Sequence, residues 1–476
     1  MDGAIVDFAK LYVDGRWVDP LGDSRIDVLN PATEAVVASV PRGTSGDVDR
    51  AVAAAARAFP AWSMMPVPDR QRHLNALAHE LRNQAAAIAD TIVAELGMPI
   101  DAALDVQTLG AAEILQNYAD EMDTVTWEHK LGNSLVVKEP IGVVGAITPW
   151  NYPLYQIASK AGAALAAGST VVVKPSELTP LNAYHLAAAA DAAGLPSGVL
   201  NVVPGTGTET GEALAAHPGI DMISLTGSTR SGRRVAALAA PGIKRVGLEL
   251  GGKSAGIVLD DADLETAVRG VVRNCCRNSG QSCSSQTRLL VPRRLLTHAA
   301  EIAAAAAHAL QLGDPTEHGD HLGPLVSAGQ RERVRAFIDQ AIAEGCTLVA
   351  GGSAAPAGFC VGYYVEPTVF TDVDPGATIA QAEVFGPVLC LIGYQSADDA
   401  IAIANNSSYG LSGGVWSSSS DRAMTVARSL RTGEVQINGA PFNVRAPFGG
   451  YKQSGYGREL GPYGIEEYLQ TKAIHL

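Results

Sequence analysis

The sequence predicts an α/β protein with two sheet-containing units. From residue 141 onward, short apolar segments alternate with helical ones, which is typical of a parallel sheet covered by helices on both faces. The second half of the chain repeats this alternation in a separate unit. With 476 residues, of which 47% are hydrophobic and 18% charged, the chain is expected to be globular and to hold two or three domains.

The region before this alternation is expected to hold strands and then helices. Residues 11–40 have the pattern of short strands and turns, with Asp14-Gly15 as a hairpin turn. Helices are predicted at Ser45–Phe59, Pro68–Leu96 and Ile100–Asp120, where apolar residues recur at helical spacing.

A β-hairpin arm is predicted at Thr124–Glu139. The segment alternates, is rich in Val and Thr, and carries Gly132-Asn133 at its centre. Its unpaired edge would invite a strand of a partner chain, and an ordinary surface hairpin is the alternative. The last dozen residues are expected to form a closing strand.

The first sheet is expected to have five strands. They are predicted at residues 141–147, 170–173, 199–203, 222–225 and 244–248, and a helix follows each of the first four. Ligands of such sheets bind beyond the carboxyl ends of the strands. The residues at those ends are Thr148-Pro149-Trp150-Asn151, Lys174-Pro175-Ser176-Glu177, Pro204-Gly205-Thr206-Gly207, Thr226-Gly227-Ser228 and Glu249-Leu250-Gly251. They suit a phosphate-bearing ligand seated on helix N-termini.

The second unit is expected to have seven strands. They are predicted at residues 256–259, 286–291, 347–349, 364–370, 388–394, 413–416 and 434–437. A helical run at 263–278 is expected to end at Ser279-Gly280, and a Gly-rich loop follows the last strand at Gly449–Gly461.

Composition excludes several classes of protein. A net charge of −14 argues against a nucleic-acid or anionic-membrane partner. Six cysteines without a CxxC spacing indicate a reducing compartment and no metal site. The N-terminus MDGAIVDFAK lacks the order of a signal peptide, and no apolar tract is long enough to span a membrane. A soluble, cytoplasmic protein is expected.

Cys283 is the first candidate for chemistry, within the stretch NCCRNSGQSCSS. On a loop just past a helix, a cysteine can be reached by a substrate and act as a thiolate nucleophile. The alternative is a packed thiol, since cysteine is among the most buried residue types. Cys275 and Cys276 lie inside the helical run and are expected to pack.

Two glutamates are further candidates. Glu249 ends an apolar strand before two glycines, so that its carboxylate is either structurally paired or poised as a base. Glu177 follows the second strand, where an acidic residue often binds a ribose hydroxyl, and a solvated charge is the alternative.

The chain resembles the aldehyde dehydrogenase superfamily over nearly its whole length. The motifs that carry the resemblance are TPWNYP (148–153), KPSE (174–177), LTGST (225–229), ELGGK (249–253), GQSC (280–283), EVFGPV (383–388) and PFGGYKQSGYGRELG (447–461). The resemblance implies a variant Rossmann cofactor domain (residues 1–122 and 141–251), a catalytic α/β domain (252–448) and a small β oligomerisation segment (123–140 and 462–476). It also implies a homodimer or homotetramer.

The resemblance implies a catalytic role for five residues. Cys283 would be the nucleophile that attacks the aldehyde, and Asn151 would hold the resulting oxyanion together with the backbone N–H of Cys283. Glu249 would be the general base that activates water to hydrolyse the thioester. Lys160 and Glu459 match positions associated with proton relay and water positioning.

The resemblance also implies NAD as cofactor. Its expected binding residues are Ile147, Thr148, Pro149, Trp150, Lys174, Ser176, Glu177, Gly207, Gly211, Thr226, Gly227, Ser228, Leu250, Gly251, Glu383 and Phe385. An acidic Glu177 should repel a 2′-phosphate, which favours NAD over NADP, although Lys174 could compensate.

The implied substrate is a small-molecule aldehyde. Its expected contacts are Tyr152, Ser159, Ser282, Ser284 and Phe442. Ser159 stands where many relatives have a bulky aromatic residue, which hints at a bulkier aldehyde.

Three alternatives compete with this interpretation. A CoA-acylating enzyme tends to lack a base such as Glu249, and a non-catalytic binding protein on the same fold would be expected to lose Cys283, Glu249 or Asn151. A cysteine protease would need a histidine motif to pair with Cys283, and none is present.

Overall fold

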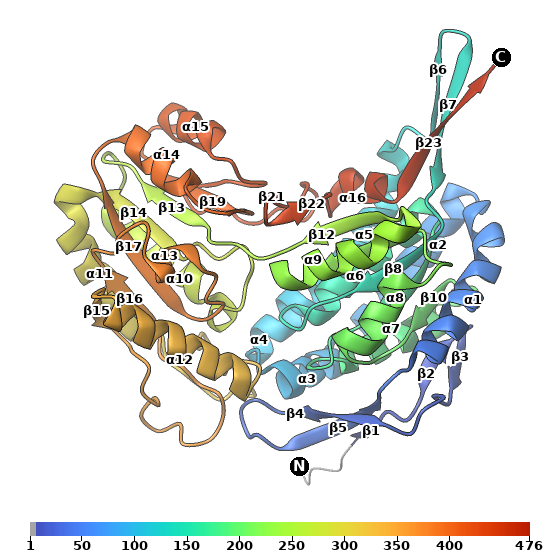
Figure 1. Cartoon of the computed structure of the whole chain (residues 1–476), viewed down its shortest axis with the longest axis horizontal. Coiled ribbons are helices and arrows are strands. Elements are labelled where there is room, and N and C mark those ends of the chain that lie inside the picture. Colours follow the sequence, from blue (N-terminus) through green and yellow to red (C-terminus); the bar gives the residue numbers. More distant parts are fainter. Residues whose placement is uncertain (1–5) are drawn as a thin grey trace.

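The computed structural model describes residues 6–476 and shows two sheet-containing halves side by side (Figure 1). Half of the stretch MDGAIVDFAK, on which the prediction of no signal peptide rests, lies outside the described residues. No helix within the described range is long and apolar enough to cross a membrane.

The first half is built around five parallel strands, as predicted. In spatial order these are β12 (Arg245–Glu249), β11 (Met222–Thr226), β8 (Val143–Ile147), β9 (Thr170–Lys174) and β10 (Leu200–Val202). Antiparallel strands extend both edges: β2 (Leu11–Val13) and β3 (Arg16–Val18) beside β10, and β22 (Gly455–Tyr456) beside β12. The predicted Asp14-Gly15 turn joins β2 to β3, with φ of 57° and 70°.

Helices follow the parallel strands and cover the sheet. They are α6 (Pro153–Ala167), α7 (Leu181–Ala192), a π-helical turn η3 (Gly207–Gly211) that leads into α8 (Glu212–Ala216), and α9 (Thr229–Ala239). The N-terminal part adds α1 (Ser45–Ser63), α2 (Val67–Asn83), α3 (Ala85–Leu96), α4 (Ile100–Ala102), the π-helix η1 (Ala103–Leu109) and α5 (Gly110–Glu121). A small sheet of β1 (Val6–Asp7), β5 (Val36–Pro41) and β4 (Arg25–Leu29) lies at the N-terminus.

The prediction of one continuous helix over residues 68–96 is wrong. Gln84 leaves the helical conformation, with φ −99° and ψ 11°, and separates α2 from α3. The break lets each segment bury its own apolar face, with Leu77 and Leu81 on α2 and Ile88 and Ile92 on α3.

The second half holds a seven-stranded sheet, also as predicted. In spatial order its strands are β15 (Thr347–Ala350), β16 (Thr368–Thr371), β17 (Val388–Tyr394), β14 (Arg288–Pro292), β13 (Ala255–Val258), β19 (Gly413–Trp416) and β20 (Gln436–Ile437). All pairs are parallel except β15 with β16. The helices around it are α10 (Leu264–Cys276), α11 (Leu296–Ala309), α12 (Ala328–Ala343), α13 (Thr378–Gln381), α14 (Ala397–Asn405) and α15 (Ser420–Ser429).

The end of α10 differs from the prediction. The helix ends at Cys276, and Arg277–Gly280 form one tight turn, η5, in which Asn278 and Ser279 have left-handed backbone angles. Cys275 and Cys276 are buried within α10, as expected.

A separate three-stranded sheet projects from the first half (Figure 1). The predicted hairpin is present as β6 (Glu128–Leu131) and β7 (Ser134–Pro140), and the predicted C-terminal strand β23 (Leu469–His475) pairs antiparallel with β7. Helix α16 (Gly461–Glu467) precedes β23, and the Gly-rich loop before it contains β21 (Tyr451–Lys452), which pairs with β18 (Tyr409–Gly410).

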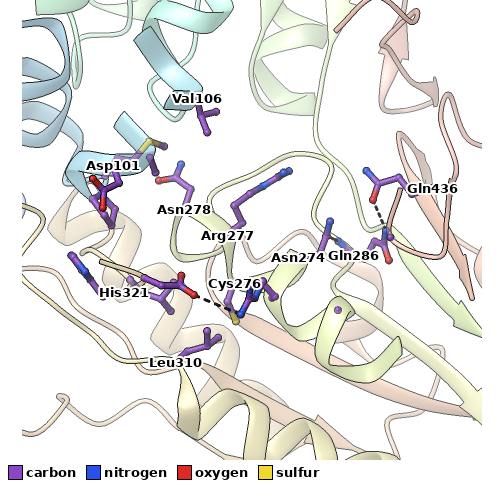
Figure 2. A pocket seen from close by; sticks show the side chains of 18 of the residues that line it. Asp101, Val106, Asn274, Cys276, Arg277, Asn278, Gln286, Leu310, His321 and Gln436 are labelled. Atoms are coloured by element: carbon purple, nitrogen blue, oxygen red, sulfur yellow. Dashed lines mark hydrogen bonds and ion pairs between the residues drawn. The ribbon is translucent and has the colours of Figure 1, made fainter. Parts of the chain in front are cut away.

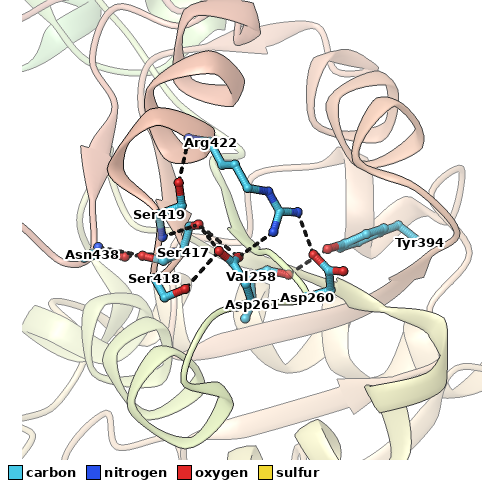
Figure 3. Close-up of polar contacts among 9 residues, drawn as sticks. All are labelled: Val258, Asp260, Asp261, Tyr394, Ser417, Ser418, Ser419, Arg422 and Asn438. Carbon is cyan, nitrogen blue, oxygen red and sulfur yellow. Dashed lines mark hydrogen bonds and ion pairs between the residues drawn. The ribbon is translucent and has the colours of Figure 1, made fainter.

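A polar network fastens the ends of β13 and β19 to α15 (Figure 3). Asp261 accepts hydrogen bonds from Ser417 (2.8 Å) and Ser418 (3.0 Å) and lies 3.2 Å from Arg422. Asn438 bonds both ways with the backbone of Ser417, accepting from its N–H at 2.9 Å and donating to its carbonyl at 3.0 Å. These side chains satisfy one another, which indicates a structural role.

Candidate active site

Cys283 lies where the two halves of the molecule meet. It follows the η5 turn on the connection from α10 to β14, and it is half-buried. Two cavities share its side chain, one of about 330 Å³ and one of about 280 Å³. They are named the Glu249 cavity and the Tyr152 cavity after a residue that only one of the two contains.

The Glu249 cavity lies beyond the carboxyl ends of β8, β11 and β12. Of the residues singled out in the sequence, it is lined by Pro149, Trp150, Asn151, Thr226, Gly227, Ser228, Glu249, Leu250, Gly251, Cys283, Glu383 and Phe385. Residues from both halves of the chain therefore meet around one space. The rings of Trp150 and Phe385, both in its lining, pack edge to face with their centroids 5.2 Å apart.

The Tyr152 cavity lies on the other side of Cys283. It gathers Tyr152, Ser159, Ser282, Ser284, Phe442 and Glu459 from the predicted set. Ser159 is buried in its wall, and its hydroxyl donates to the carbonyl of Tyr155 at 3.0 Å. The small side chain leaves the cavity open at this point.

Glu249 is a buried carboxyl group beside the thiol of Cys283. Only 3% of the residue is exposed, and neither carboxylate oxygen accepts a hydrogen bond from an N–H or O–H group of residues 6–476. Burial raises the pKa of Glu249 to about 8, and the negative charge of Glu459 adds to the shift, while Lys160 and the thiol of Cys283 oppose it. A carboxyl group in this state exchanges a proton near neutral pH, as a general base must.

The thiol of Cys283 responds to the same surroundings. Burial raises its pKa well above the usual range, and the neighbouring carboxyl groups, Glu249 first among them, add to the shift. The resting group is therefore a neutral thiol that has to lose its proton before it attacks a substrate.

Asn151 faces the same loop from the first half. Its side-chain amide donates one hydrogen bond, to the carbonyl of Gln281 at 3.0 Å. An amide nitrogen carries two N–H groups, so that a second donor remains for a ligand in the Glu249 cavity.

Lys160 lies behind the Tyr152 cavity and connects its wall to the first sheet. It is completely buried, forms an ion pair with Glu459, and donates to the hydroxyl of Thr226 at 2.5 Å. Thr226 in turn donates to Gln156 at 3.2 Å. This chain of polar groups links the two cavities.

The remaining predicted cofactor residues line neither cavity and gather at the ends of β8, β9 and η3. Lys174 donates to the carboxylate of Glu177 at 2.9 Å, and the backbone N–H of Gly207 lies 3.5 Å from the other oxygen. Gly211 lies against the Lys174 side chain. Ile147 ends β8, the N–H of Thr148 donates to the carbonyl of Lys174 at 3.1 Å, and the Ser176 hydroxyl accepts from Leu178 at 3.3 Å.

Several residues of the cavity walls were not singled out in the sequence. They include Tyr155, Arg277 and Phe448 in the Tyr152 cavity, and Arg230, Arg333 and Tyr409 in the Glu249 cavity. Arg277 also borders a third cavity, of about 860 Å³ (Figure 2). Its place in the run before Cys283 was a usable signal, whereas Arg333 and Tyr409 come from remote elements that carry no motif.

No cluster of three or more histidine, cysteine or acidic residues suited to a metal ion occurs within residues 6–476.

The sequence profile of the aldehyde dehydrogenase family matches residues 17–474, and the chain belongs to this family. The resemblance drawn from the motifs is thereby confirmed.

Three proteins are similar to this chain over nearly its whole length. The chain is 48% identical to a 3-succinoylsemialdehyde-pyridine dehydrogenase from a Pseudomonas species, with 98% of each chain covered. Among solved structures, it matches a cysteine-to-alanine variant of aldehyde dehydrogenase C from Pseudomonas syringae, in complex with NAD+ and octanal. That match has a TM-score of 0.97 and 47% identity, over 98% of this chain and 96% of the other. A Mycobacterium tuberculosis aldehyde dehydrogenase complexed with NAD+ also has a TM-score of 0.97, at 42% identity over 99% of both chains.

Proposed function

We propose that this protein oxidises an aldehyde to the carboxylic acid with NAD, with Cys283 as nucleophile and Glu249 as general base. The observation that carries the proposal is the place of Cys283 on both cavities. A substrate carbonyl in the Tyr152 cavity and a hydride acceptor in the Glu249 cavity would meet at its sulfur.

The residues present fit NAD. A Cβ built on Gly227 would meet nothing closer than 3.8 Å, which leaves open space beside the N-terminus of α9 for a pyrophosphate. Glu177, held by Lys174, would accept hydrogen bonds from the adenosine ribose and repel a 2′-phosphate. Trp150, Glu383 and Phe385 would enclose the nicotinamide end. When bound, NAD supplies the hydride acceptor.

The first chemical step belongs to Cys283 and Asn151. The Cys283 thiol gives up its proton to solvent, and its thiolate attacks the aldehyde carbon, so that a C–S bond forms as the carbonyl π pair moves to oxygen. The free N–H of the Asn151 amide and the backbone N–H of Cys283 stabilise that oxyanion. Loss of hydride from this carbon restores the carbonyl as a thioester on Cys283.

The second step belongs to Glu249. Its carboxylate takes a proton from a water molecule, whose oxygen attacks the thioester carbon and releases the acid and the Cys283 thiolate. The buried chain of Lys160 and Glu459 would return protons toward the Tyr152 cavity.

The aldehyde class follows from the Tyr152 cavity. We infer a bulky or long aldehyde, because Ser159 leaves open a wall that a larger side chain would fill. The octanal bound by the Pseudomonas syringae relative supports this class.

We also propose the larger organisation that the motifs implied. Residues 1–122 and 141–251 would bind the cofactor and 252–448 would carry the nucleophile, since the chain changes sheets between β12 and β13. Residues 123–140 and 462–476 would join copies of the chain into a homodimer or homotetramer in the cytoplasm.

The test is NADH formation with short aliphatic, long aliphatic, aromatic and amino aldehydes. Cys283→Ala should lower kcat by more than roughly 10³-fold with every aldehyde, whereas Cys360→Ala, which changes an exposed cysteine, should match the wild type. Full activity in Cys283→Ala would overturn the assignment of the nucleophile.

A further inference from the structure

The turn before Cys283 has an unusual backbone. Asn278, Ser279 and Gly280 adopt left-handed conformations in succession, with φ of 52°, 55° and 76°. For residues other than glycine, each such conformation is strained, because the Cβ atom comes close to the backbone. Contacts made by the turn must offset that strain.

The side chain of Asn278 makes the central contacts. Its amide nitrogen donates to the carbonyl of Asn151 at 3.0 Å and lies 3.3 Å from the carbonyl of Gln281. The carbonyl of Asn278 accepts from the backbone and the side chain of Gln281, at 3.0 and 3.1 Å. Asn151 follows β8 of the first sheet and Gln281 precedes Cys283, so that one amide connects the loops that carry the proposed oxyanion donor and the nucleophile.

The same turn also contacts two further segments of the chain. A Cβ on Gly280 would lie 2.1 Å from the backbone of Gly386, so glycine is needed for this close approach to the loop that carries Phe385. Ser279 donates to the carbonyl of Gly323 at 2.6 Å, which fixes the turn from its other side.

We propose that Asn278 is a positioning residue for the reaction. Its amide holds Asn151 and the Cys283 loop in register, so that the Asn151 side chain reaches the carbonyl of Gln281 and its second N–H points to the reacting oxygen. The proposal rests on the proposed function for its catalytic meaning. The two hydrogen bonds that the Asn278 amide donates, to the carbonyl groups of Asn151 and Gln281, are called the clamp. They do not require a bound ligand.

The competing explanation is that Asn278 only favours a left-handed turn, as asparagine commonly does. Asn438 provides the matched control. It has a φ of 51° and also bonds through its side chain to a neighbouring backbone, but its partner is Ser417 in the network of Figure 3, and it lines neither of the two cavities that contain Cys283.

Substitution by glycine separates the two explanations. Glycine adopts the left-handed backbone without strain, so Asn278→Gly keeps the turn and loses the clamp. Asn278→Asp keeps the shape, but a carboxylate cannot donate to the two carbonyl groups. With NAD and the best aldehyde of the panel, both variants should lose kcat by roughly 10- to 100-fold, as expected for a displaced catalytic group. KM should change by less than about twofold, and Asn438→Gly should retain the wild-type kcat.

A second measurement needs neither cofactor nor aldehyde. Alkylation of Cys283 by iodoacetamide, followed by peptide mass spectrometry, should be roughly threefold or more faster in Asn278→Gly, because the loop opens more often. Asn438→Gly should match the wild type. Wild-type kcat and alkylation rate in Asn278→Gly would overturn the positioning role, as would equal losses in the Asn438→Gly control. A wild-type protein inactive on all aldehydes would overturn the proposed function alone, and the alkylation rates would still decide the clamp.

Discussion

Glu249 and Glu95 both belong to the first half of the molecule, and burial raises the pKa of each carboxyl group to about 8. They differ in their partners. The oxygens of Glu95 accept hydrogen bonds from the backbone N–H groups of Leu181 (2.8 Å) and Asn182 (3.2 Å), and from the side chain of Asn182. Those of Glu249 accept none from an N–H or O–H group of residues 6–476 and face a cavity, with the thiol of Cys283 beside them.

The contrast between the two glutamates shows which property identifies a functional carboxyl group. A shifted pKa is shared by both glutamates and therefore does not distinguish them. Glu95 holds the first residues of α7, whose N–H groups would otherwise lack acceptors, so that its burial serves the fold. The free oxygens of Glu249 are available to a water molecule or a thiol, which is what a base requires.

Replacing Glu249 should have the largest effect on activity. Glu249→Gln should leave a burst of NADH from the first turnover and lower the steady-state rate by roughly 10²- to 10⁴-fold, because an amide cannot accept the proton of water. Stopped-flow absorbance separates the two phases. A normal steady state would remove Glu249 from the role of base.

The pH dependence of turnover also tests the role of Glu249 as base. Since the raised pKa keeps Glu249 protonated at low pH, wild-type turnover should increase with pH until it levels near the pKa of about 8. The residual turnover of Glu249→Gln should lack this rise.

Replacing Glu95 should affect stability and leave turnover per folded molecule intact. Glu95→Leu strands two buried N–H groups at the start of α7, at a cost of about 2 kcal/mol or more, seen as a lower urea midpoint. Lost activity at an unchanged urea midpoint would show that Glu95 acts in the active site. The two glutamates would then not differ in role.

The contribution of Glu95 to stability should fall as pH rises, whereas turnover should increase with pH. A carboxyl group whose pKa is raised by folding stabilises the protein while protonated, and that contribution is lost as pH rises from its unfolded value of 4.5 through about 8. The wild type should therefore lose more stability between pH 5 and 8 than Glu95→Gln, which does not ionise. Urea midpoints measured across this range test the difference.

The sequence distinguishes the two glutamates only in part. Glu249 ends an apolar strand within a family motif, so both its place and its candidate role were predictable. Glu95 lies inside a helical pattern, and its partner Asn182 is 87 residues away, so that nothing local announces its burial.

The same limit applies around Cys283. The strands, the arm and the gathering of motifs at the strand ends follow from periodicity and from the family. The left-handed turn at Asn278 does not, because the helical pattern runs through it and its hydrogen bonds lead to Asn151, 127 residues away. Contacts between remote segments decide the details of the site, and such contacts leave no periodic signal.

Glu177 is an intermediate case, because it forms an ion pair with Lys174 and 39% of its side chain is exposed. Because its charge should repel a 2′-phosphate, Glu177→Gln should raise the ratio of kcat/KM for NADP to that for NAD by about tenfold, with little change in stability. Glu265→Gln, which breaks an exposed ion pair with Arg269 on α10, is the matched control and should leave the ratio unchanged. If Glu177→Gln leaves the NADP to NAD ratio unaltered, the paired and partly exposed carboxylate of Glu177 has a structural role, like that of Glu95. A shifted ratio would mean that one open side is enough to give a paired carboxylate a role in binding.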